Sequence, residues 1–533
     1  MSRPGGFSRF ILPLLLLPLL PRAAAAQDPL ARTTLVVFIT VDQMRGDYLD
    51  RFGAQLTGGL ARLKTGGAVF ANASLDYAIT ETAPGHATGM SGRFPRSTGI
   101  FSNSLGVYDP QAPSIGGGAA PASPFRFRGS TLIDWMRSRN PQSRALSVSR
   151  KDRGAILPMG RAQQEVYWYA SDGRFTTSTY YADTLPAWVR QFNARRLPHQ
   201  YAGKAWTPLL PASEYPEPDS VTVENRGQGI VFPHVAPADS ALAARVLPNY
   251  PWMDQLTLDF ALEGLRQLDL GQGPAVDLLA ISLSTTDAVG HAFGPDSREL
   301  HDQILRLDRA LGAFFDRLFQ IRDSAGVIVA LTADHGVTPF PEVYSARTGR
   351  PAGQVDLSGV AGIVRARILA RGVDSSAWQW EDGVLWMDRG AFTRAGVSAD
   401  FAVREFMTAA RENPGVLRVD QVRSLAQQDT SRDYVSRRWL HMIPPELPVE
   451  VVVTLKEHYV WGPASYAMHG SPHDDDARVP IMLYGAPFKP GAYRDNARVV
   501  DLAPTLAAVL GVAPTERVDG RVLRAALRSA GTN

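Results

Sequence analysis

Three apolar runs that each lead to an aspartate constrain the fold of this chain more than any other feature. Residues 34–41, 276–283 and 326–332 are rich in aliphatic and β-branched residues, and Asp42, Asp287 and Asp334 follow them. Continuous apolar runs of this kind are typical of strands that are buried on both faces of a sheet. We therefore predict three interior strands, and a fourth at residues 479–485.

The segment between the second and third runs has the pattern of an amphipathic helix. Its apolar face is formed by Leu300, Ile304, Leu307, Leu311, Phe314 and Leu318. Asp296 with Glu299 resembles a capping box at its start. A strand, a helix and a strand in this order form a βαβ unit, which predicts an α/β fold with a mostly parallel sheet flanked by helices on both faces. The carboxyl ends of such strands meet at one edge, where these sheets place their sites.

The candidate site residues run from Asp42 to His469, which argues against a chain of separate domains. Length alone predicts about three domains for 533 residues. We instead predict one catalytic domain over residues 27–533, with insertions at about 160–250 and 340–465 that fold over the site. Residues 51–64 have helical spacing and are predicted to form one helix.

The first 26 residues have the pattern of a secretory signal peptide. Arg3 and Arg9 form a basic end, residues 10–20 are apolar, and three alanines at 24–26 precede Gln27 as a cleavage site. Without this segment, which carries three arginines and no acid, the 55 basic residues fall to 52 and equal the 52 acidic ones. The excess of basic residues in the full sequence therefore gives no reason to expect a nucleic-acid partner or a membrane anchor. An exported protein without cysteine fits a periplasmic or secreted location.

The stretch Thr82-Ala83-Pro84-Gly85-His86 is predicted to be a strand-to-helix turn, with a helix beginning near Ala87. A hydroxyl at such a turn lies near free backbone N–H groups and the positive end of a helix dipole, which suits an anionic substrate. We predict that Thr82 is the nucleophile of a two-metal phosphatase. His86 is expected to pack or cap beside it.

Six side chains at or near the ends of the predicted strands are candidate metal ligands: Asp42, Asp287, His291, Asp334, His335 and His469. Mixed aspartate and histidine ligation without thiolate suits zinc or a similar divalent ion. Two such ions about 4 Å apart clamp a phosphoryl group between its attacking and leaving oxygens, and one of them lowers the pKa of the attacking hydroxyl.

Several motifs occur in an order that is characteristic of one family. They are Val41-Asp42-Gln43, Thr82-Ala83-Pro84-Gly85-His86, Asp287 with His291, Asp334-His335-Gly336, His469-Gly470, Val500-Asp501-Leu502-Ala503-Pro504-Thr505-Leu506 and Asp519-Gly520-Arg521. On these motifs the chain resembles the alkaline phosphatase superfamily, in the branch with type I phosphodiesterases and nucleotide pyrophosphatases. The resemblance implies two zinc ions. Asp287, His291 and His469 would hold one, while Asp42, Asp334, His335 and Thr82 would meet the other. His473 competes with His469 for the last position.

Three further polar residues indicate the substrate class. Asn103 follows the nucleophile, and Lys151 and Arg153 form a small cationic cluster. These residues resemble the PafA-like group of periplasmic phosphate monoesterases, in which the Asn, Lys and Arg contact the phosphoryl oxygens. A monoester is close to dianionic above its second pKa of about 6, so its oxygens need dedicated donors. The predicted substrates are small-molecule phosphate monoesters.

Two other functions stay open. A phosphodiesterase or nucleotide pyrophosphatase would use the same scaffold, and a metal-binding or phosphate-binding protein without catalytic activity would keep the fold. An arylsulfatase is less consistent with the sequence, because residues 82–86 offer neither a cysteine or serine nucleophile nor the arginine of that motif. The remaining histidines, at positions 199, 234, 301, 441 and 458, are expected to be surface or structural residues.

Overall fold

The computed structural model describes residues 1–2, 5–6, 33–381, 383–462 and 466–528. The apolar stretch of the predicted signal peptide, residues 10–20, lies outside the described residues. No helix among the described residues is long and apolar enough to cross a membrane.

A nine-stranded sheet forms the centre of the molecule, with the strand order β17-β2-β16-β9-β1-β8-β3-β4-β5. The five central strands from β9 to β4 are parallel to one another. In sheet order the strands are β17 (Gly491–Ala492), β2 (Ala68–Ser74), β16 (Arg478–Tyr484), β9 (Val327–Thr332), β1 (Leu35–Val41), β8 (Asp277–Leu283), β3 (Ala145–Ser149), β4 (Glu165–Tyr169) and β5 (Phe175–Thr176).

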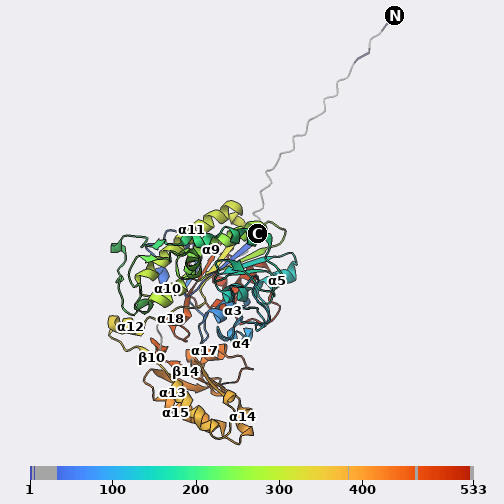
Figure 1. The fold of residues 1–533 in the computed structure, drawn as a ribbon. Helices are drawn as coiled ribbons and strands as arrows, with labels where there is room; N and C mark the ends of the chain where they lie inside the picture. Colours follow the sequence, from blue (N-terminus) through green and yellow to red (C-terminus); the bar gives the residue numbers. More distant parts are fainter. Residues whose placement is uncertain (3–4, 7–32, 382, 463–465, 529–533) are drawn as a thin grey trace.

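Helices cover both faces of this sheet (Figure 1). One face carries α2 (Gly59–Gly66), α9 (Trp252–Gln267) and α11 (Arg298–Ile321), and the other carries α3 (Thr82–Ser91), α5 (Leu132–Arg139), α6 (Asp152–Ile156) and α19 (Leu502–Leu510). The connecting helices are α1 (Tyr48–Arg51), α4 (Pro95–Thr98), α7 (Ala187–Ala194), α8 (Ser240–Val246), α10 (Thr285–Phe293), α12 (Pro341–Thr348) and α18 (Asp474–Ala477). The predicted α/β architecture is confirmed.

A second lobe is built from the later of the two predicted insertions (Figure 1). Its four-stranded sheet has the order β11-β12-β14-β13 and consists of β11 (Trp378–Glu381), β12 (Val384–Met387), β14 (Val449–Leu455) and β13 (Val416–Gln421). The helices of this segment are α13 (Ser358–Leu369), α14 (Arg389–Arg394), α15 (Ala399–Arg411), α16 (Val422–Leu425) and α17 (Tyr434–Met442). Most of the lobe shares a hydrophobic core of its own, separate from the core around the large sheet.

Two short strand pairs complete the fold: β6 (Ala205–Trp206) with β7 (His234–Val235), and β10 (Gly353–Val355) with β15 (Tyr459–Trp461). The earlier predicted insertion is not wholly separate from the main sheet, because β4 and β5 extend that sheet at its edge. One catalytic domain over residues 27–533 stays a prediction.

The four predicted strands are present as β1, β8, β9 and β16, with ends that differ by one residue from the predicted ones. The fourth strand, β16, runs antiparallel to β9. All six residues of the predicted apolar helix face are buried in α11.

Two local predictions around α11 and α2 are wrong. The cap of α11 is Ser297, whose side chain accepts a hydrogen bond from Leu300 N, while Asp296 instead pairs with Arg51 and Arg347. The helix predicted over residues 51–64 is broken into α1 and α2. Gly58 and Gly59 lie so close to the backbone of α11 that a Cβ on either would approach it to less than 3 Å, and the chain makes its break there.

Candidate active site

The three aspartates that follow the parallel strands meet at one edge of the sheet. Asp42 directly follows β1, Asp287 lies in the first turn of α10 after β8, and Asp334 lies just beyond β9. All three are almost fully buried, with exposed fractions of 4% or less. Burying three carboxylates together costs free energy unless positive charges or hydrogen-bond donors lie beside them.

Three histidine rings face these carboxylates, and each is oriented by the backbone. In each ring Nδ1 lies within hydrogen-bond distance of a carbonyl oxygen: His291 at 2.6 Å from Ala467 O, His335 at 2.9 Å from Gly336 O and His469 at 2.8 Å from Thr80 O. A carbonyl can only accept, so in the neutral ring Nδ1 carries the proton and Nε2 keeps its lone pair. This is the arrangement that orients histidines as metal ligands.

The Nε2 atoms and the carboxylate oxygens form two overlapping clusters. One consists of Asp42, Asp334 and His335, and the other of Asp287, His335 and His469, with the ligand atoms of each cluster within 4.8 Å of one another. His291 Nε2 joins the second cluster at 3.3 Å from Asp287 Oδ1. Asp42 Oδ1 and Asp334 Oδ2 have no hydrogen-bond partner among the described residues. Buried oxygens without donors, beside oriented imidazoles, fit a pair of divalent cations.

Thr82 is the first residue of α3 and its hydroxyl faces both clusters. Thr82 Oγ1 lies 3.4 Å from His335 Nε2 and accepts a hydrogen bond of 3.2 Å from Lys151 Nζ. The side chain is 1% exposed. The predicted helix start near Ala87 is therefore too late. Pro84 fits in the first turn of α3 because its missing N–H would have no partner within the helix.

Lys151 is the cation at the centre of this arrangement. Its ammonium group lies 2.7 Å from Asp42 Oδ2 and 2.7 Å from Asp287 Oδ2. Arg150, the residue before it, also contacts Asp287, with Nη2 at 3.3 Å from Oδ2. Arg150 is therefore a site residue that the sequence does not assign, and only its position next to Lys151 points to it.

Gln43 is a second site residue that the sequence did not assign. Its backbone N–H donates to Asp334 Oδ1 at 3.0 Å and its side chain donates to Asp287 Oδ1 at 3.2 Å. Its φ angle of 66° turns the chain sharply after β1. Gln43 therefore joins two of the candidate ligands to the end of a third strand.

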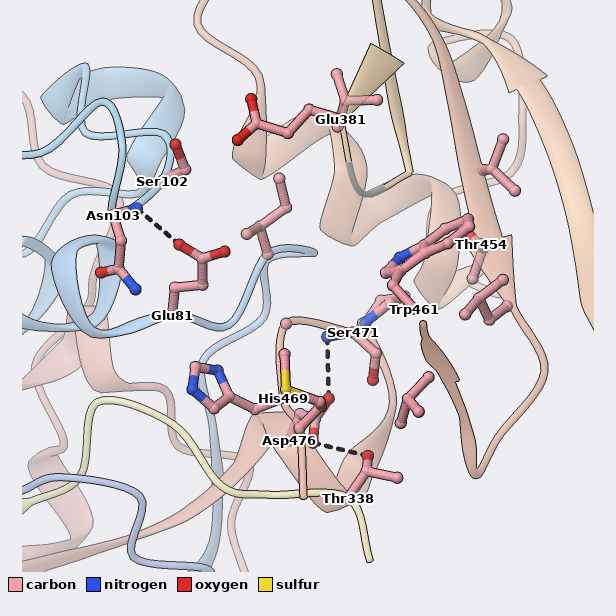
Figure 2. Close-up of a pocket in the computed structure, with 18 of the residues that line it drawn as sticks. Glu81, Ser102, Asn103, Thr338, Glu381, Thr454, Trp461, His469, Ser471 and Asp476 are labelled. Carbon is pink, nitrogen blue, oxygen red and sulfur yellow. Dashed lines mark hydrogen bonds between the residues drawn. The ribbon is translucent and has the colours of Figure 1, made fainter. Parts of the chain in front are cut away.

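Asn103 is brought beside Thr82, whereas among the described residues no hydrogen bond or ion pair joins Arg153 to the candidate ligands. Asn103 Oδ1 accepts a hydrogen bond of 2.9 Å from Ala83 N, and the backbone N–H of Asn103 donates to Glu81 Oε2 at 2.6 Å (Figure 2). With its oxygen held by Ala83, the amide has its NH₂ group left as a donor. The guanidinium of Arg153, two residues after Lys151, pairs with Asp152 at 3.6 Å.

The electrostatics of the cluster are those of a cation site. Burial raises the pKa of Asp287, but the contact with Lys151 outweighs it and the net pKa falls well below its usual value. Burial lowers the pKa of His335, but the charge of Asp334 raises it to about 9. The Asp287 shift reflects nearby positive charge and the His335 shift reflects nearby negative charge, so the buried carboxylates stay ionised beside cations and favour bound positive charge.

The other two candidate histidines are accounted for. His86 is buried, with Nδ1 2.9 Å from Thr82 O and Nε2 2.8 Å from Ser282 Oγ, so it packs beside Thr82 as predicted. His473 lies elsewhere, with Nε2 2.7 Å from Leu455 O. The geometry therefore favours His469 over His473 as a ligand.

A model of the type I phosphodiesterase/nucleotide pyrophosphatase family matches residues 36–374. The chain belongs to this family, within the alkaline phosphatase superfamily. The matched span contains Thr82 and the three strand-end aspartates, whereas His469 lies beyond it.

Members of this family named alkaline phosphatases are similar over nearly the whole chain. Alkaline phosphatase PhoV of Synechococcus elongatus is 31% identical over 92% of this chain and 92% of its own length. PhoK of Sphingomonas sp is 32% identical over 94% of this chain and 92% of its own length. The crystal structure of alkaline phosphatase PafA matches with a TM-score of 0.85 at 27% identity, covering 93% of this chain and 99% of PafA.

Proposed function

We propose that this protein hydrolyses phosphate monoesters in two steps, through a phosphothreonine at Thr82 beside two zinc ions. The observation that carries the proposal is the convergence of three histidine Nε2 atoms and three buried carboxylates around a single buried hydroxyl. The similarity to alkaline phosphatases over more than nine tenths of the chain supports the same reaction class.

The proposed ligand sets follow the two clusters. Asp287, His291 and His469 would hold one zinc ion, and Asp42, Asp334 and His335 the other. Zinc bound there would supply the Lewis acidity that lowers the pKa of an attacking hydroxyl and stabilises charge on a departing oxygen. His335 also belongs geometrically to the cluster of Asp287 and His469, so it could serve either proposed ligand set.

The chain's own residues carry the two chemical steps. In the first, Thr82 Oγ forms a bond to phosphorus, the bond from phosphorus to the leaving oxygen breaks, and the alcohol departs with a proton. In the second, water attacks the same phosphorus, the bond to Thr82 breaks, and inorganic phosphate leaves as the hydroxyl is restored. The N-terminus of α3 faces the reaction, which favours the negative charge of the phosphoryl group.

The donors for the phosphoryl oxygens are proposed to be Asn103, Lys151 and Arg153. Asn103 and Lys151 are supported by contacts with the residues around Thr82. A crystallised PafA variant carries substitutions at one threonine, one asparagine, one lysine and one arginine, and these types stand here in the same order and with the same separations within the Thr–Asn and Lys–Arg pairs. Arg150 competes with Arg153, because Arg150 contacts Asp287.

The test compares one monoester with one matched diester on zinc-loaded protein. We expect phenyl phosphate to have a higher kcat/KM than methyl phenyl phosphate, and Thr82→Ala to lower turnover by at least about a thousandfold. Lys151→Ala should reduce kcat/KM for the monoester more than for the diester, because the monoester carries the extra charge. Zinc content is measured for every variant, and exposed Lys456→Ala serves as the control.

The outcomes separate the alternatives. A preference for the diester would favour a phosphodiesterase or nucleotide pyrophosphatase on this scaffold. Bound zinc without turnover, unchanged by Thr82→Ala, would favour a metal-binding or phosphate-binding protein. We also infer export to the periplasm or the medium, from the signal-like residues 1–26 and the absence of cysteine in the sequence; detection of the chain in a periplasmic extract tests this.

A further inference from the structure

A cavity of about 250 Å³ lies between the candidate active site and the second lobe (Figure 2). Glu81 and Asn103 form one side of it, Glu381 and Trp461 come from the second lobe on the other, and His469 lies at its lower end. The cavity therefore borders both a proposed phosphoryl donor and a proposed ligand.

Five aromatic side chains contribute to the walls of this cavity: Phe101, Trp386, Trp439, Tyr459 and Trp461. Phe101, two residues before Asn103, meets Trp386 of β12 edge-to-face at a centroid distance of 5.3 Å. Trp461 and Tyr459 of β15 line another wall, and both are partly exposed rather than fully buried. Trp439 donates its Nε1–H to Thr454 Oγ1 at 2.9 Å, so the polar atom of this ring is satisfied and its apolar surface faces the cavity. Such walls favour flat aromatic groups.

Three carboxylates line the cavity: Glu81 on the side of Asn103, Glu381 on the side of the second lobe, and Asp476, which accepts hydrogen bonds from Thr338 Oγ1 and Ser471 N. Glu81 accepts the backbone N–H of Asn103 at 2.6 Å, and Glu381 is exposed with its carboxylate directed toward the side formed by Ser102 and Asn103 (Figure 2). These carboxylates would repel a second anionic group on a substrate bound in the cavity. A neutral or cationic group would not be repelled.

We propose that this cavity binds the leaving group of the substrate, and that the leaving group is a neutral or positively charged aromatic alcohol. The inference rests on the proposed function, because it names the part of a phosphate monoester that lies beyond the phosphoryl group. A cavity of about 150 Å³ suffices for benzene in another protein, so 250 Å³ accommodates a substituted aromatic ring.

A second cavity, of about 670 Å³, borders the ligands on the side of Asp287 and His291. Its lining is also mixed, with Arg150, Asn225 and Asn249 beside the aromatic residues Trp206, Phe293 and Tyr466. Tyr250 is the aromatic residue there that serves as a comparison, since its ring stacks on Trp252 at 5.1 Å rather than on a residue of the first cavity.

The kinetic test uses the ratio of kcat/KM for phenyl phosphate to that for ethyl phosphate, which both contain the same phosphoryl group. We expect Trp461→Ala and Trp386→Ala to lower this ratio about tenfold, the value of one or two lost aromatic contacts, with ethyl phosphate nearly unchanged. Phe401→Ala, an exposed aromatic on α15 of the same lobe, should leave the ratio unchanged. An unchanged ratio in both tryptophan variants, or a loss only in Tyr250→Ala, overturns the proposal, as does an equal loss for both substrates.

A binding measurement separates this proposal from the proposed function. Calorimetry on zinc-loaded Thr82→Ala protein compares phenylphosphonate with methylphosphonate, neither of which is hydrolysed. Phenylphosphonate should bind more tightly than methylphosphonate, and this difference should disappear when Trp461→Leu is added to Thr82→Ala. That result would support the aromatic binding role of the cavity even if the wild-type protein has no phosphatase activity. Equal binding of the two phosphonates to a protein that does hydrolyse phenyl phosphate overturns the cavity assignment and leaves the proposed function standing.

The charge preference has its own test in Glu381→Gln. Wild-type kcat/KM should be lower for 4-carboxyphenyl phosphate than for 4-(aminomethyl)phenyl phosphate, and the gap should narrow in the variant by several-fold. A gap that is absent in the wild type, or identical in Glu381→Gln, contradicts the charge part of the proposal.

Discussion

Glu224 is a buried carboxyl group whose neighbours are also acidic. It is 3% exposed, and burial together with the charges of Glu299 and Asp219 raises its pKa to about 9. One oxygen of Glu224 and one of Glu299 have no hydrogen-bond partner among the described residues, while the other oxygen of Glu299 lies 2.8 Å from His234 Nε2. Glu224 is therefore protonated in the folded protein at neutral pH.

Because of this shift, we predict that Glu224 makes the folded protein less stable as the pH rises. The unfolded carboxyl has a pKa near 4.5 and the folded one near 9, so the folded state holds the proton more tightly. The stabilising contribution is complete below pH 4.5 and disappears as the pH rises through 9. Glu224→Gln replaces the carboxyl group with an amide that stays neutral at every pH. Between pH 5 and 8 the free energy of unfolding of the wild type should therefore fall by at least about 1 kcal/mol relative to that of the variant.

Urea unfolding of the zinc-loaded proteins at several pH values checks this prediction. Exposed Glu214→Gln is the matched control and should parallel the wild type. Parallel curves for the wild type and Glu224→Gln would contradict the assignment of a neutral carboxyl at this position.

Individual site residues could be predicted from the sequence where a strand end and a ligand type coincide. Asp42, Asp287 and Asp334 met this condition, and parallel strands bring them to one edge. Gln43 and Arg150 could not be assigned, because their contacts depend on a φ of 66° at Gln43 and on where the side chain after β3 points. Neither property is visible in residue type or spacing.

The break between α1 and α2 is fixed by a contact between elements. Buried Asp308 of α11 accepts three backbone N–H groups at the start of α2, from Thr57 at 2.7 Å, Gly58 at 2.6 Å and Ala61 at 3.1 Å. This carboxylate caps α2 from outside its own sequence, which is why periodicity alone predicted one unbroken helix over residues 51–64.

Removing this cap should cost far more than removing a surface ion pair between the same two helices. Asp308→Ala leaves three backbone N–H groups without their acceptor, and we expect the free energy of unfolding to fall by about 2 kcal/mol or more. Asp316→Ala, which removes the exposed contact with Arg62, should change it by less than about 1 kcal/mol. Urea midpoints of the two variants measure the difference. Equal effects would show that Asp308 does not act as the cap of α2.

The structure of the second lobe could be predicted least from the sequence. Its strands pair across long separations, as β12 with β14 does, and no local pattern predicts which apolar residues line a cavity and which fill a core. Trp378 is buried in the core of the lobe, whereas Trp386 and Trp461, which are the same residue type, line the cavity beside the active site. The placement of a site between two separately cored parts of the chain is a property of the assembled molecule.

The same division predicts how the whole molecule responds to loss of metal. The proposed ligands follow β1 and β9 or lie in α10 and in the segment before α18, so removing the ions leaves buried carboxylates of distant segments to repel one another. Dipicolinate should abolish turnover and lower the unfolding temperature, with a stability loss of about 2.7 kcal/mol for each site previously held at a hundredfold excess of zinc over its Kd. Hydrogen exchange should quicken at the ends of those strands, at the start of α3 and in residues 466–471. It should stay unchanged in α13 and α15, because their core is separate. Readdition of zinc should restore all three readouts. Faster exchange spread evenly over both lobes, or full retention of protection at the strand ends without zinc, would contradict a metal centre assembled from these elements.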